Sequence, residues 1–528
     1  MQKVKIIGAY VKDVQPGIYK NVAVFDITSS YPNQIISCNI SPEKRDIQAE
    51  KEIKRYLRMK GILNLDKVLT QGNLDRVLRE VFFDLDFFEK NVTPILKDKG
   101  VCFTPNLTAY KTDELGRFPL IVKDAFDTRK LWKKLWEKLE FINGELEQNK
   151  MSKEEAIKEI EKILSETELP EQKKFLQELL SNFDKLSQFV DTAYMIQYAL
   201  KVEINSFYGA FSNKNFMFFN KDDAQTITAM GQLCVRGVAN YIEKQLNYEV
   251  KNIYSDTDSI FLKFNDNLDF ETILEKYVND KIPKIIDEYF ERLSEALNLT
   301  SRRIFMECEV ISDKTIFMAK KKYIMRLKWK EGVEYDISKS PFKYKIKGFD
   351  IVKSSTPEFV KEIFSEVIDL VMMEKTEKEM KEYLSNKFLE FIKQPIEEIS
   401  TARQINGYEK YAFKSNPKLG QYALKIPIHV KGAVLYNFLI KELGLITDEI
   451  YEGDKIKYIY VKPNPWNSNV ISFKNRLPKE IKELFKYDFE TQFEKTVLQP
   501  LEPLFKAINY KSLLTDSFRV SQTSLALI

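Results

Sequence analysis

The stretch Asn252–Leu262 carries two aspartates, Asp256 and Asp258, in a short polar turn between apolar, β-forming residues. This pattern predicts a β-hairpin with carboxylates at its tip. Strand alternation turns both carboxylates to the same side, and two neighbouring carboxylates repel one another unless a cation lies between them. Hard divalent ions such as Mg²⁺ take oxygen ligands and suit phosphate chemistry. Taken alone, the stretch is better explained as a hairpin whose turn happens to be rich in aspartate.

Two further stretches supply side chains that could act with this hairpin. Val22–Pro32 predicts an apolar strand that brings Asp26 to its end. Lys201–Gly209 predicts a helix that ends at its final glycine. On that helix Lys201 and Asn205 are one turn apart, so one face presents both side chains.

In order along the chain, these stretches resemble motifs A, B and C of the family B DNA polymerases, D-x-x-S-x-Y-P, K-x-x-x-N-S-x-Y-G and Y-x-D-T-D-S. Within the family, the T-even-type bacteriophage replicative polymerases are the most similar. The resemblance extends to Ile40–Glu43, Lys320–Tyr323 and Lys353–Pro357, so it covers nearly the whole chain. It implies an α+β right-hand polymerase with an antiparallel-sheet palm, helical-hairpin fingers and a mixed, largely helical thumb.

The resemblance also implies an order of domains. Within the first palm segment, the apolar positions Val77, Val81, Leu85 and Phe88 have helical spacing, and we assign them to packing. The implied domains are 1–115 for the first part of the palm (with a helical insertion at about 47–100), 116–213 for the fingers, 214–344 for the second part of the palm, and 345–528 for the thumb with a C-terminal tail.

In the implied fingers, a long helical pattern starts near Phe118 and a second helical arm runs from Phe175 to Asn205. The stretch Asn143–Glu171 is strongly charged and contains the breaker Pro170. We expect it to be the tip that joins two antiparallel helices.

The implied chemistry is a two-metal phosphoryl transfer, in which two Mg²⁺ ions (or Mn²⁺ in their place) lie about 3.5–4 Å apart between carboxylates from separate strands. By resemblance, Asp26, Asp258 and Ile27 are the metal ligands, and Asp26, Asp258 and Asp256 are the catalytic residues. One ion activates the primer 3′-hydroxyl and the other holds the triphosphate. Glu309, on the expected strand Arg303–Val310, resembles a further acid near the family's site, although a solvated strand carboxylate explains it equally well.

The resemblance further implies a pocket for the incoming nucleotide. Arginine suits forked contact with phosphate oxygens, and lysine acts as a point charge. Tyr31 resembles the family's steric gate, whose ring leaves no room for a ribose 2′-hydroxyl. Ser30 departs from the family, which usually has an apolar residue there, and this puts fine details of the pocket in doubt. The implied dNTP-binding residues are Arg129, Lys133, Lys201, Asn205, Tyr31, Ser29, Ser30, Tyr208 and Gly209.

Lysine-rich stretches after motif C resemble the family's contacts with the primer–template duplex. Lys320–Tyr323 is similar to the K-K-x-Y segment, which we expect to be a basic strand with an adjacent aromatic residue. The start of the implied thumb adds further lysines, and the stretch Tyr408–Lys431 is also basic. The implied DNA-binding residues are Lys320, Lys321, Tyr323, Lys347 and Lys353.

The composition excludes several other classes of protein. The net charge is only +4, so a nucleic-acid site must come from local clustering of charge. The four cysteines are scattered without a C-x-x-C pair, which argues against a zinc module and fits a reducing compartment. The single His429 excludes Ser-His or Cys-His catalysis. With no signal peptide and no apolar run of membrane-spanning length, we expect a cytoplasmic protein, or one in the cytoplasm of an infected cell, with no membrane partner.

Two further partners are expected. Family B polymerases usually carry an N-terminal 3′→5′ exonuclease, but only 25 residues precede Asp26. We therefore expect that domain to be absent, with two alternatives: the chain is the polymerase half of a split enzyme whose exonuclease is a separate subunit, or it is a natural or engineered truncation. The tail Gln522–Ile528 has a Q-x-x-L-x-L pattern that resembles sliding-clamp peptides, although folding back onto the thumb is the alternative.

Template-directed DNA synthesis on primer–template DNA from dNTPs is thus the leading hypothesis. The first alternative is a non-catalytic DNA-binding subunit that retains the fold, but a decayed site should lose Asp26, Asp258, Lys201 and Asn205 first. The second alternative, a palm-type reverse transcriptase, lacks the K-x-x-x-N-S-x-Y-G helix.

Overall fold

The computed structural model describes residues 6–65, 67–68, 70–349, 351, 353–511 and 513. The chain divides into two compact units, and helices and antiparallel strand pairs occur in both. The predicted α+β class is therefore confirmed. The first unit comprises Met1–Lys12, Val24–Leu262 and Glu271–Cys308, and the second comprises Asp13–Ala23, Lys263–Phe270 and Glu309–Ile528.

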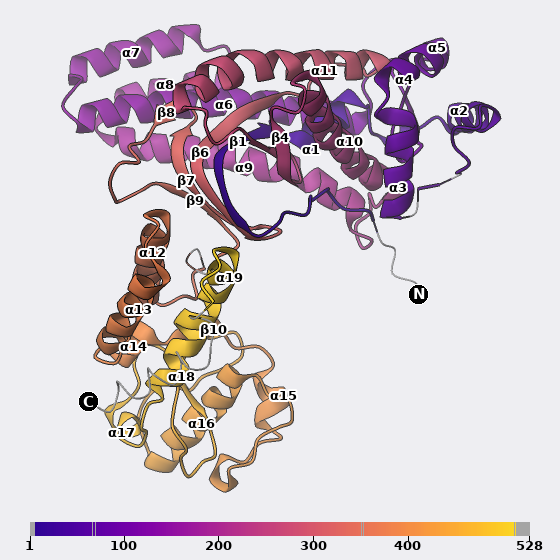
Figure 1. Ribbon diagram of the computed structural model, residues 1–528. Coiled ribbons are helices and arrows are strands. Elements are labelled where there is room, and N and C mark those ends of the chain that lie inside the picture. Colours follow the sequence, from indigo (N-terminus) through magenta and orange to yellow (C-terminus); the bar gives the residue numbers. More distant parts are fainter. Residues whose placement is uncertain are drawn as a thin grey trace. The chain divides into compact units, whose positions relative to one another are not determined.

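The first unit is mainly helical (Figure 1). Between residues 47 and 100 it contains short helices, as expected, and Val77, Val81, Leu85 and Phe88 are all buried. Its elements are β1 (Gly17–Ile27, shared with the second unit), α1 (Ser30–Ser37), α2 (Ile47–Met59), α3 (Gln71–Val77), α4 (Leu85–Asn91), α5 (Thr93–Lys99), β2 (Val101–Phe103), β3 (Ala109–Lys111), α6 (Arg117–Glu147), α7 (Lys153–Glu166), α8 (Pro170–Ser181), α9 (Leu186–Ser212), α10 (Lys221–Gln245), β4 (Lys251–Asp256), β5 (Ser259–Lys263) and α11 (Ile282–Ala296).

Strands β4 and β5 form the predicted hairpin, and β1 lies beside β5 in the sheet. Residues Val22–Phe25 of β1 are all buried. A continuous apolar run of this kind is typical of a strand that is covered on both faces. The strand then ends at Ile27, directly after Asp26, as the sequence predicted.

The two long helices α6 and α9 pack against one another, and α7 and α8 connect them (Figure 1). The stretch Asn143–Glu171 does join α6 to the later helices, as expected, but most of it is helical, and the second arm expected at Phe175–Asn205 is divided between α8 and α9. Ser152 and Glu155 form a reciprocal capping box that starts α7. Pro170 is the first residue of α8, where its missing N–H costs nothing, so it begins a helix instead of breaking one.

These four helices have an apolar core of their own. The ring of Trp132 on α6 contacts that of Phe175 on α8 edge to face, with centroids 5.3 Å apart. Such contacts add to the stabilisation that burial of the rings provides. The buried members of this core are Trp132, Leu135, Leu139, Ile142, Ala156, Ile160, Ile163, Leu176, Leu179, Leu186, Val190 and Ala193.

Helix α10 is buried along most of its length and packs against α1, α11 and β4. It therefore supports both the helix that follows Asp26 and the strand that precedes the Asp256 turn. Gly237 on α10 allows α11 to approach closely, because a Cβ at this position would lie 1.8 Å from the hydroxyl oxygen of Tyr289. That hydroxyl is buried and has no hydrogen-bond partner among the described residues.

In the second unit the strand order is β1-β6-β7-β8, and β9 pairs with β7. The strand expected at Arg303–Val310 begins three residues later than predicted, at Met306, and continues to Ala319 as β6. β6 and β7 form a long antiparallel hairpin, in which Ala319 pairs with Lys322. The other strands here are β7 (Lys322–Lys330), β8 (Val333–Glu334) and β9 (Tyr344–Lys347).

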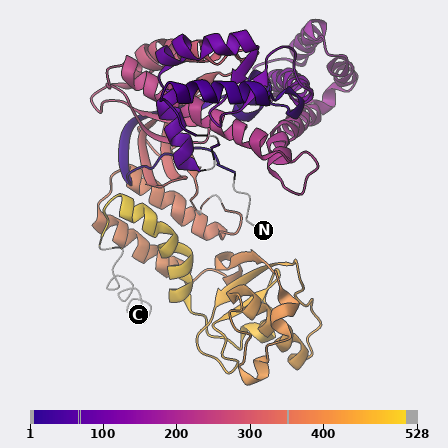
Figure 2. The same ribbon diagram turned by 90° about the vertical axis from the view of Figure 1, so that its right-hand side faces the viewer.

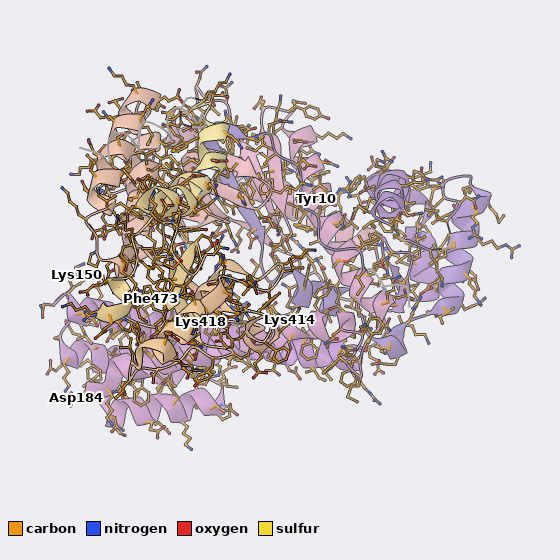
Figure 3. The ribbon with its side chains drawn as sticks, turned by 90° about the horizontal axis from the view of Figure 1, so that it is seen from below. Tyr10, Lys150, Asp184, Lys414, Lys418 and Phe473 are labelled. Carbon is orange, nitrogen blue, oxygen red and sulfur yellow. The ribbon has the colours of Figure 1, made fainter. Side chains whose placement is uncertain are left out.

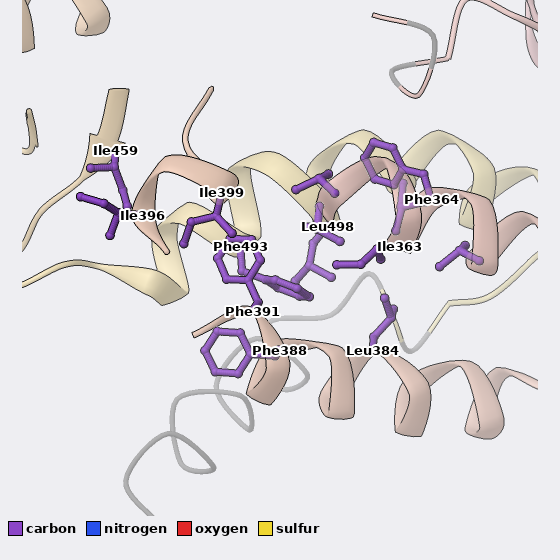
Figure 4. Close-up of a cluster of buried hydrophobic side chains, with 14 of the residues drawn as sticks. Ile363, Phe364, Leu384, Phe388, Phe391, Ile396, Ile399, Ile459, Phe493 and Leu498 are labelled. Carbon is purple, nitrogen blue, oxygen red and sulfur yellow. The ribbon is translucent and has the colours of Figure 1, made fainter. Parts of the chain in front are cut away.

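The rest of the second unit combines helices with a three-stranded sheet, and Figure 2 shows α12 and α13 beside α19. One apolar core runs through these elements; in it Phe493 contacts both Phe388 and Phe391 with centroids 5.2 Å apart (Figure 4). The elements are α12 (Glu358–Met372), α13 (Glu377–Phe391), α14 (Ile396–Ile399), β10 (Thr401–Gln404), α15 (Tyr408–Ala412), α16 (Ile428–Leu443), β11 (Lys455–Tyr460), β12 (Val470–Phe473), α17 (Lys479–Lys482), α18 (Phe489–Phe493) and α19 (Gln499–Ala507).

Among the described residues, none of the helices combines the length and the apolar character that crossing a bilayer requires.

The contact between α10 and α11 gives a stability prediction. Gly237→Ala should lower the free energy of unfolding by about 1–3 kcal/mol, because the new methyl group overlaps the Tyr289 hydroxyl. Tyr289→Phe in the same chain should recover part of this loss, since it removes the overlapping atom. Chemical denaturation of the three proteins measures both effects.

Gly144→Ala is the matched control, because position 144 also lies within a helix but a Cβ there meets no atom within 4 Å among the residues that the structure describes. It should leave stability unchanged or raise it, by up to about 1 kcal/mol. Equal losses at positions 237 and 144 would show that the close approach of Tyr289 is not the cause.

Candidate active site

The carboxylates of Asp26 and Asp258 come from the ends of neighbouring strands. The backbone N–H of Ile27 donates a hydrogen bond to the carbonyl oxygen of Asp258, 2.9 Å away. This bond joins the end of β1 to the β4–β5 turn, so the two aspartates are adjacent although they are far apart in sequence. Both residues are half-buried.

The turn that carries Asp258 is held by its own backbone. The N–H of Asp258 donates to the carbonyl oxygen of Asp256 at 2.7 Å, and the Ser259 hydroxyl donates to the same oxygen at 3.1 Å. Between them Thr257 has a φ of 64°, in the left-handed region that non-glycine residues rarely adopt. Backbone strain of this kind persists only where surrounding contacts impose it.

The N-terminal segment supplies those contacts, and sequence analysis did not single it out. The carbonyl oxygen of Tyr10 accepts from the N–H of Thr257 at 2.8 Å, and the N–H of Lys12 donates to the carbonyl of Ser255 at 3.0 Å. These contacts are made by backbone atoms, so the residue types of the segment give no indication of its role.

The donor set fits a hard divalent cation. Asp26 and Asp258 offer carboxylate oxygens and Ile27 offers a backbone carbonyl, which is the ligand chemistry that Mg²⁺ prefers. Within the described part of the chain, no group of three or more His, Cys, Asp or Glu side chains could by itself hold a metal ion. A cation here would therefore depend on ligands beyond these side chains, such as backbone carbonyls, waters and phosphates.

Tyr31 connects the carboxylates to helix α9. Its ring lies beside that of Tyr208, with centroids 4.9 Å apart. Burial, with smaller contributions from Tyr208 and Asp258, raises the pKa of Tyr31 well above its ordinary value. Tyr31 belongs to the first of the three sequence motifs and Tyr208 to the second, so this ring contact joins the two stretches. The rings thus form an apolar wall next to the acidic turn.

Ser29 and Ser30 shape the start of α1. Ser29 has a φ of 48°, so the chain turns sharply between Asp26 and Tyr31. Ser30 is buried, and its hydroxyl is hydrogen-bonded to the side-chain amide of Gln34 at 2.9 Å. Gln34 thus provides a hydrogen-bond partner for the buried hydroxyl, and this accommodates a polar residue at position 30.

Helix α6 carries the two predicted triphosphate-binding cations. Arg129 is half-buried, and its Nε atom has no hydrogen-bond partner among the described residues. Burial lowers the pKa of this guanidinium, and Glu137 partly opposes the change. Lys133 is exposed and pairs with Glu137 at 3.2 Å. Because exposed pairs of this type contribute little, Lys133 can leave Glu137 at small cost.

Helix α9 presents Lys201 and Asn205 at exposed positions one turn apart, as predicted. The expectation that this helix ends at Gly209 is wrong, because it continues to Ser212. A Cβ at Gly209 would meet no atom of the described residues within 4 Å, so none of these residues requires glycine here. The predicted close approach of a base pair at Gly209 stays a prediction.

The predicted DNA-binding residues lie in the second unit. Lys320 and Lys321 form the turn between β6 and β7, so the expected basic strand begins only at Lys322. Lys320 pairs with Asp13 at 2.9 Å. Tyr323 is only 3% exposed, and its ring contacts that of Phe317, so a packing role is established for it while DNA contact stays a prediction.

Other predicted lysines of this unit are accessible. Lys347 and Lys353 are exposed, and so are Lys414 and Lys418, which lie between α15 and α16 in the basic stretch (Figure 3). Glu309, the predicted accessory acid, pairs with Lys345 at 2.6 Å. The predicted clamp-binding tail Gln522–Ile528 lies outside the described residues.

The sequence pattern of DNA polymerase family B matches residues 162–508, so the chain belongs to this family. It is 27% identical, over 94% of its length, to the DNA-directed DNA polymerase of Escherichia phage RB69, and 25% identical over the same share to that of Enterobacteria phage T4. A DNA polymerase of Pyramimonas orientalis virus is 25% identical over 69% of the chain, which covers 27% of that protein. The chain covers 54% of each phage protein and thus spans about half the length of these relatives.

The β6–β7 turn gives a prediction about DNA affinity. A Cβ at Gly348, whose φ is 64°, would lie 2.2 Å from the carbonyl oxygen of Lys321. Gly348→Ala must therefore displace the turn that presents Lys320 and Lys321. We expect the Kd for a primer–template duplex to rise about three- to tenfold, as for the loss of one or two phosphate contacts. Fluorescence anisotropy at fixed salt measures this change.

Gly332→Ala is the control, because Gly332 also has a positive φ, 92°, but a Cβ there meets no atom of the described part of the chain within 4 Å. An equal loss of DNA affinity in both variants would assign the effect to general backbone strain and contradict the predicted role of the β6–β7 turn in DNA binding.

Proposed function

We propose that this chain catalyses template-directed DNA synthesis, adding deoxynucleotides from dNTPs to the 3′-hydroxyl of a primer. The observation that carries the proposal is the pairing of the Asp26 and Asp258 strand ends through the Ile27 N–H. Membership of DNA polymerase family B and the names of the phage relatives support it.

In the proposed reaction, the primer 3′-hydroxyl gives its proton to water and its oxygen forms a bond to the α-phosphorus, while the bond from that phosphorus to the pyrophosphate oxygen breaks. Asp26, Asp258 and the carbonyl of Ile27 would hold two Mg²⁺ ions, with Mn²⁺ as a substitute. Bound ions of this kind lower the pKa of the attacking hydroxyl and offset negative charge on the triphosphate. Asp256 shapes the turn, since its carbonyl oxygen accepts from both Asp258 and Ser259.

The basic residues of α6 and α9 would orient the triphosphate. Arg129 has a donor that no group of the described residues uses, so binding a phosphate oxygen would satisfy it. Lys133 and Lys201 add point charges, and Asn205 adds an amide. The wall formed by Tyr31 and Tyr208 would hold the sugar and the base, with Tyr31 excluding a 2′-hydroxyl.

The proposed substrates are primer–template DNA and dNTPs. Action as one subunit of a split replicative polymerase, a separate exonuclease partner, a sliding clamp bound by Gln522–Ile528 and a cytoplasmic location stay predictions from the sequence.

The carboxylates give the first functional prediction. Asp26→Ala and Asp258→Ala should each lower the rate of primer extension by about three orders of magnitude or more, because each removes a charged ligand from the reacting centre. Duplex binding should stay within about twofold of the parent, since the phosphate-binding lysines are unchanged. Single-nucleotide extension with Mg²⁺ and anisotropy with labelled duplex provide the two measurements.

Asp280→Asn is a suitable control, because Asp280 is an exposed acid that pairs with Lys284 within one helical turn. It should extend primers at the parental rate. Primer extension at the parental rate by either the Asp26 or the Asp258 variant would contradict the proposed function.

The ring of Tyr31 gives a second functional prediction. Tyr31→Ala should reduce the preference for dNTPs over rNTPs by at least about tenfold, because it opens space for a 2′-hydroxyl. Tyr31→Phe keeps the ring and should retain the preference. Incorporation efficiencies for matched dNTP and rNTP pairs test both variants, and an unchanged ratio in Tyr31→Ala would place sugar selection elsewhere.

A further inference from the structure

A short chain of contacts joins the strand of Asp26 to the helix of Arg129. Two residues after Asp26, the N–H of Thr28 donates to the carbonyl oxygen of Phe305 at 3.0 Å. Two residues before Phe305, the guanidinium of Arg303 donates to Asp127 on α6 at 2.8 Å. Asp127 in turn lies two residues before Arg129.

Arg303 makes two different contacts with α6. Besides its bond to Asp127, its guanidinium lies over the ring of Phe126, 5.2 Å from the centroid. Lys123, one turn earlier on the helix, also pairs with Asp127 at 3.1 Å. Burial favours protonation of Asp127, but the hydrogen bonds from Arg303 and Lys123 outweigh it and hold its pKa below the ordinary value. The pair is therefore ionised at neutral pH.

We propose that Arg303 is a positioning residue for the incoming nucleotide: through Asp127 and Phe126 it fixes α6, and with it Arg129, relative to the strand that carries Asp26. This inference rests on the proposed function. Arg303 does not itself touch the nucleotide.

The length of α6 explains why such a link matters. At its first turn the helix is anchored by Glu43, which accepts from the N–H of Arg117 at 2.7 Å. Arg129 lies twelve residues further on, roughly 18 Å along the axis, so a tilt of about 3° displaces its backbone by about 1 Å. Contacts with α1 and α9 limit this motion, and Arg303 adds a restraint within one turn of Arg129.

The test compares nucleotide binding in the full chain with and without the link. Arg303→Ala and Asp127→Ala should each raise the Kd of the correct dNTP, and its KM, about five- to tenfold, while kcat changes less than about threefold. The Kd is measured on a duplex with a dideoxy-terminated primer, through the fluorescence of Trp132 and Trp136 on α6. The reversed pair, Arg303→Asp with Asp127→Arg, should recover at least half of the lost binding free energy.

Arg302→Ala is the matched control. Arg302 is the neighbouring residue of the same segment, but it pairs with Asp287 and Glu291 on α11. Its removal should leave the dNTP Kd within twofold of the parent, with an unfolding temperature similar to that of Arg303→Ala. Parental dNTP affinity in Arg303→Ala, an equal loss in Arg302→Ala, or no recovery in the reversed pair overturns the inference.

The outcomes separate this inference from the proposed function. Absence of primer extension by the unmodified chain contradicts the polymerase proposal itself. Normal extension by that chain, together with unaltered dNTP affinity in Arg303→Ala, contradicts only the positioning role.

Discussion

A single backbone hydrogen bond, from Ile27 to the carbonyl of Asp258, brings two like charges together at half-buried strand ends. Their repulsion is larger there than in open water, because the surroundings screen it less. The fold offsets this cost elsewhere, through the buried run Val22–Phe25 and the buried helix α10 beneath the strands. The two acidic residues thus lie together at the point where the proposed function needs a cation and a triphosphate.

Strong local patterns made much of this arrangement predictable. The apolar strand ending at Asp26 and the hairpin around Asp258 follow from alternation and turn chemistry, which act over a few residues. The helices α7 and α8 in the charged stretch after Asn143 were not predicted, because Ser152 and Pro170 are common at the start of helices as well as in turns. Its high charge indicated exposure correctly, but exposure alone does not distinguish a loop from a surface helix.

Other parts of the site could not be predicted, because they depend on contacts between distant segments. Arg303 and Asp127 are 176 positions apart, and each is an ordinary charged residue in its local sequence. Tyr323 shows the opposite case: its place beside three lysines suggested an accessible aromatic ring, whereas pairing of β7 with β6 and β9 turns the ring into the core. Whether a side chain is buried depends on which strands pair with its own, and the local sequence does not predict those strands.

The separate apolar core of α6–α9 has a consequence for how this protein can vary. All of its fully buried members lie between residues 132 and 193, and α7 and α8 contribute to it without carrying any residue of the proposed site. The turn at residues 167–169 is therefore a position at which length can change without altering the spacing of Arg129 and Lys201 from the strands. A peptide tag or fluorescent protein inserted there would lie outside the residues of the proposed site.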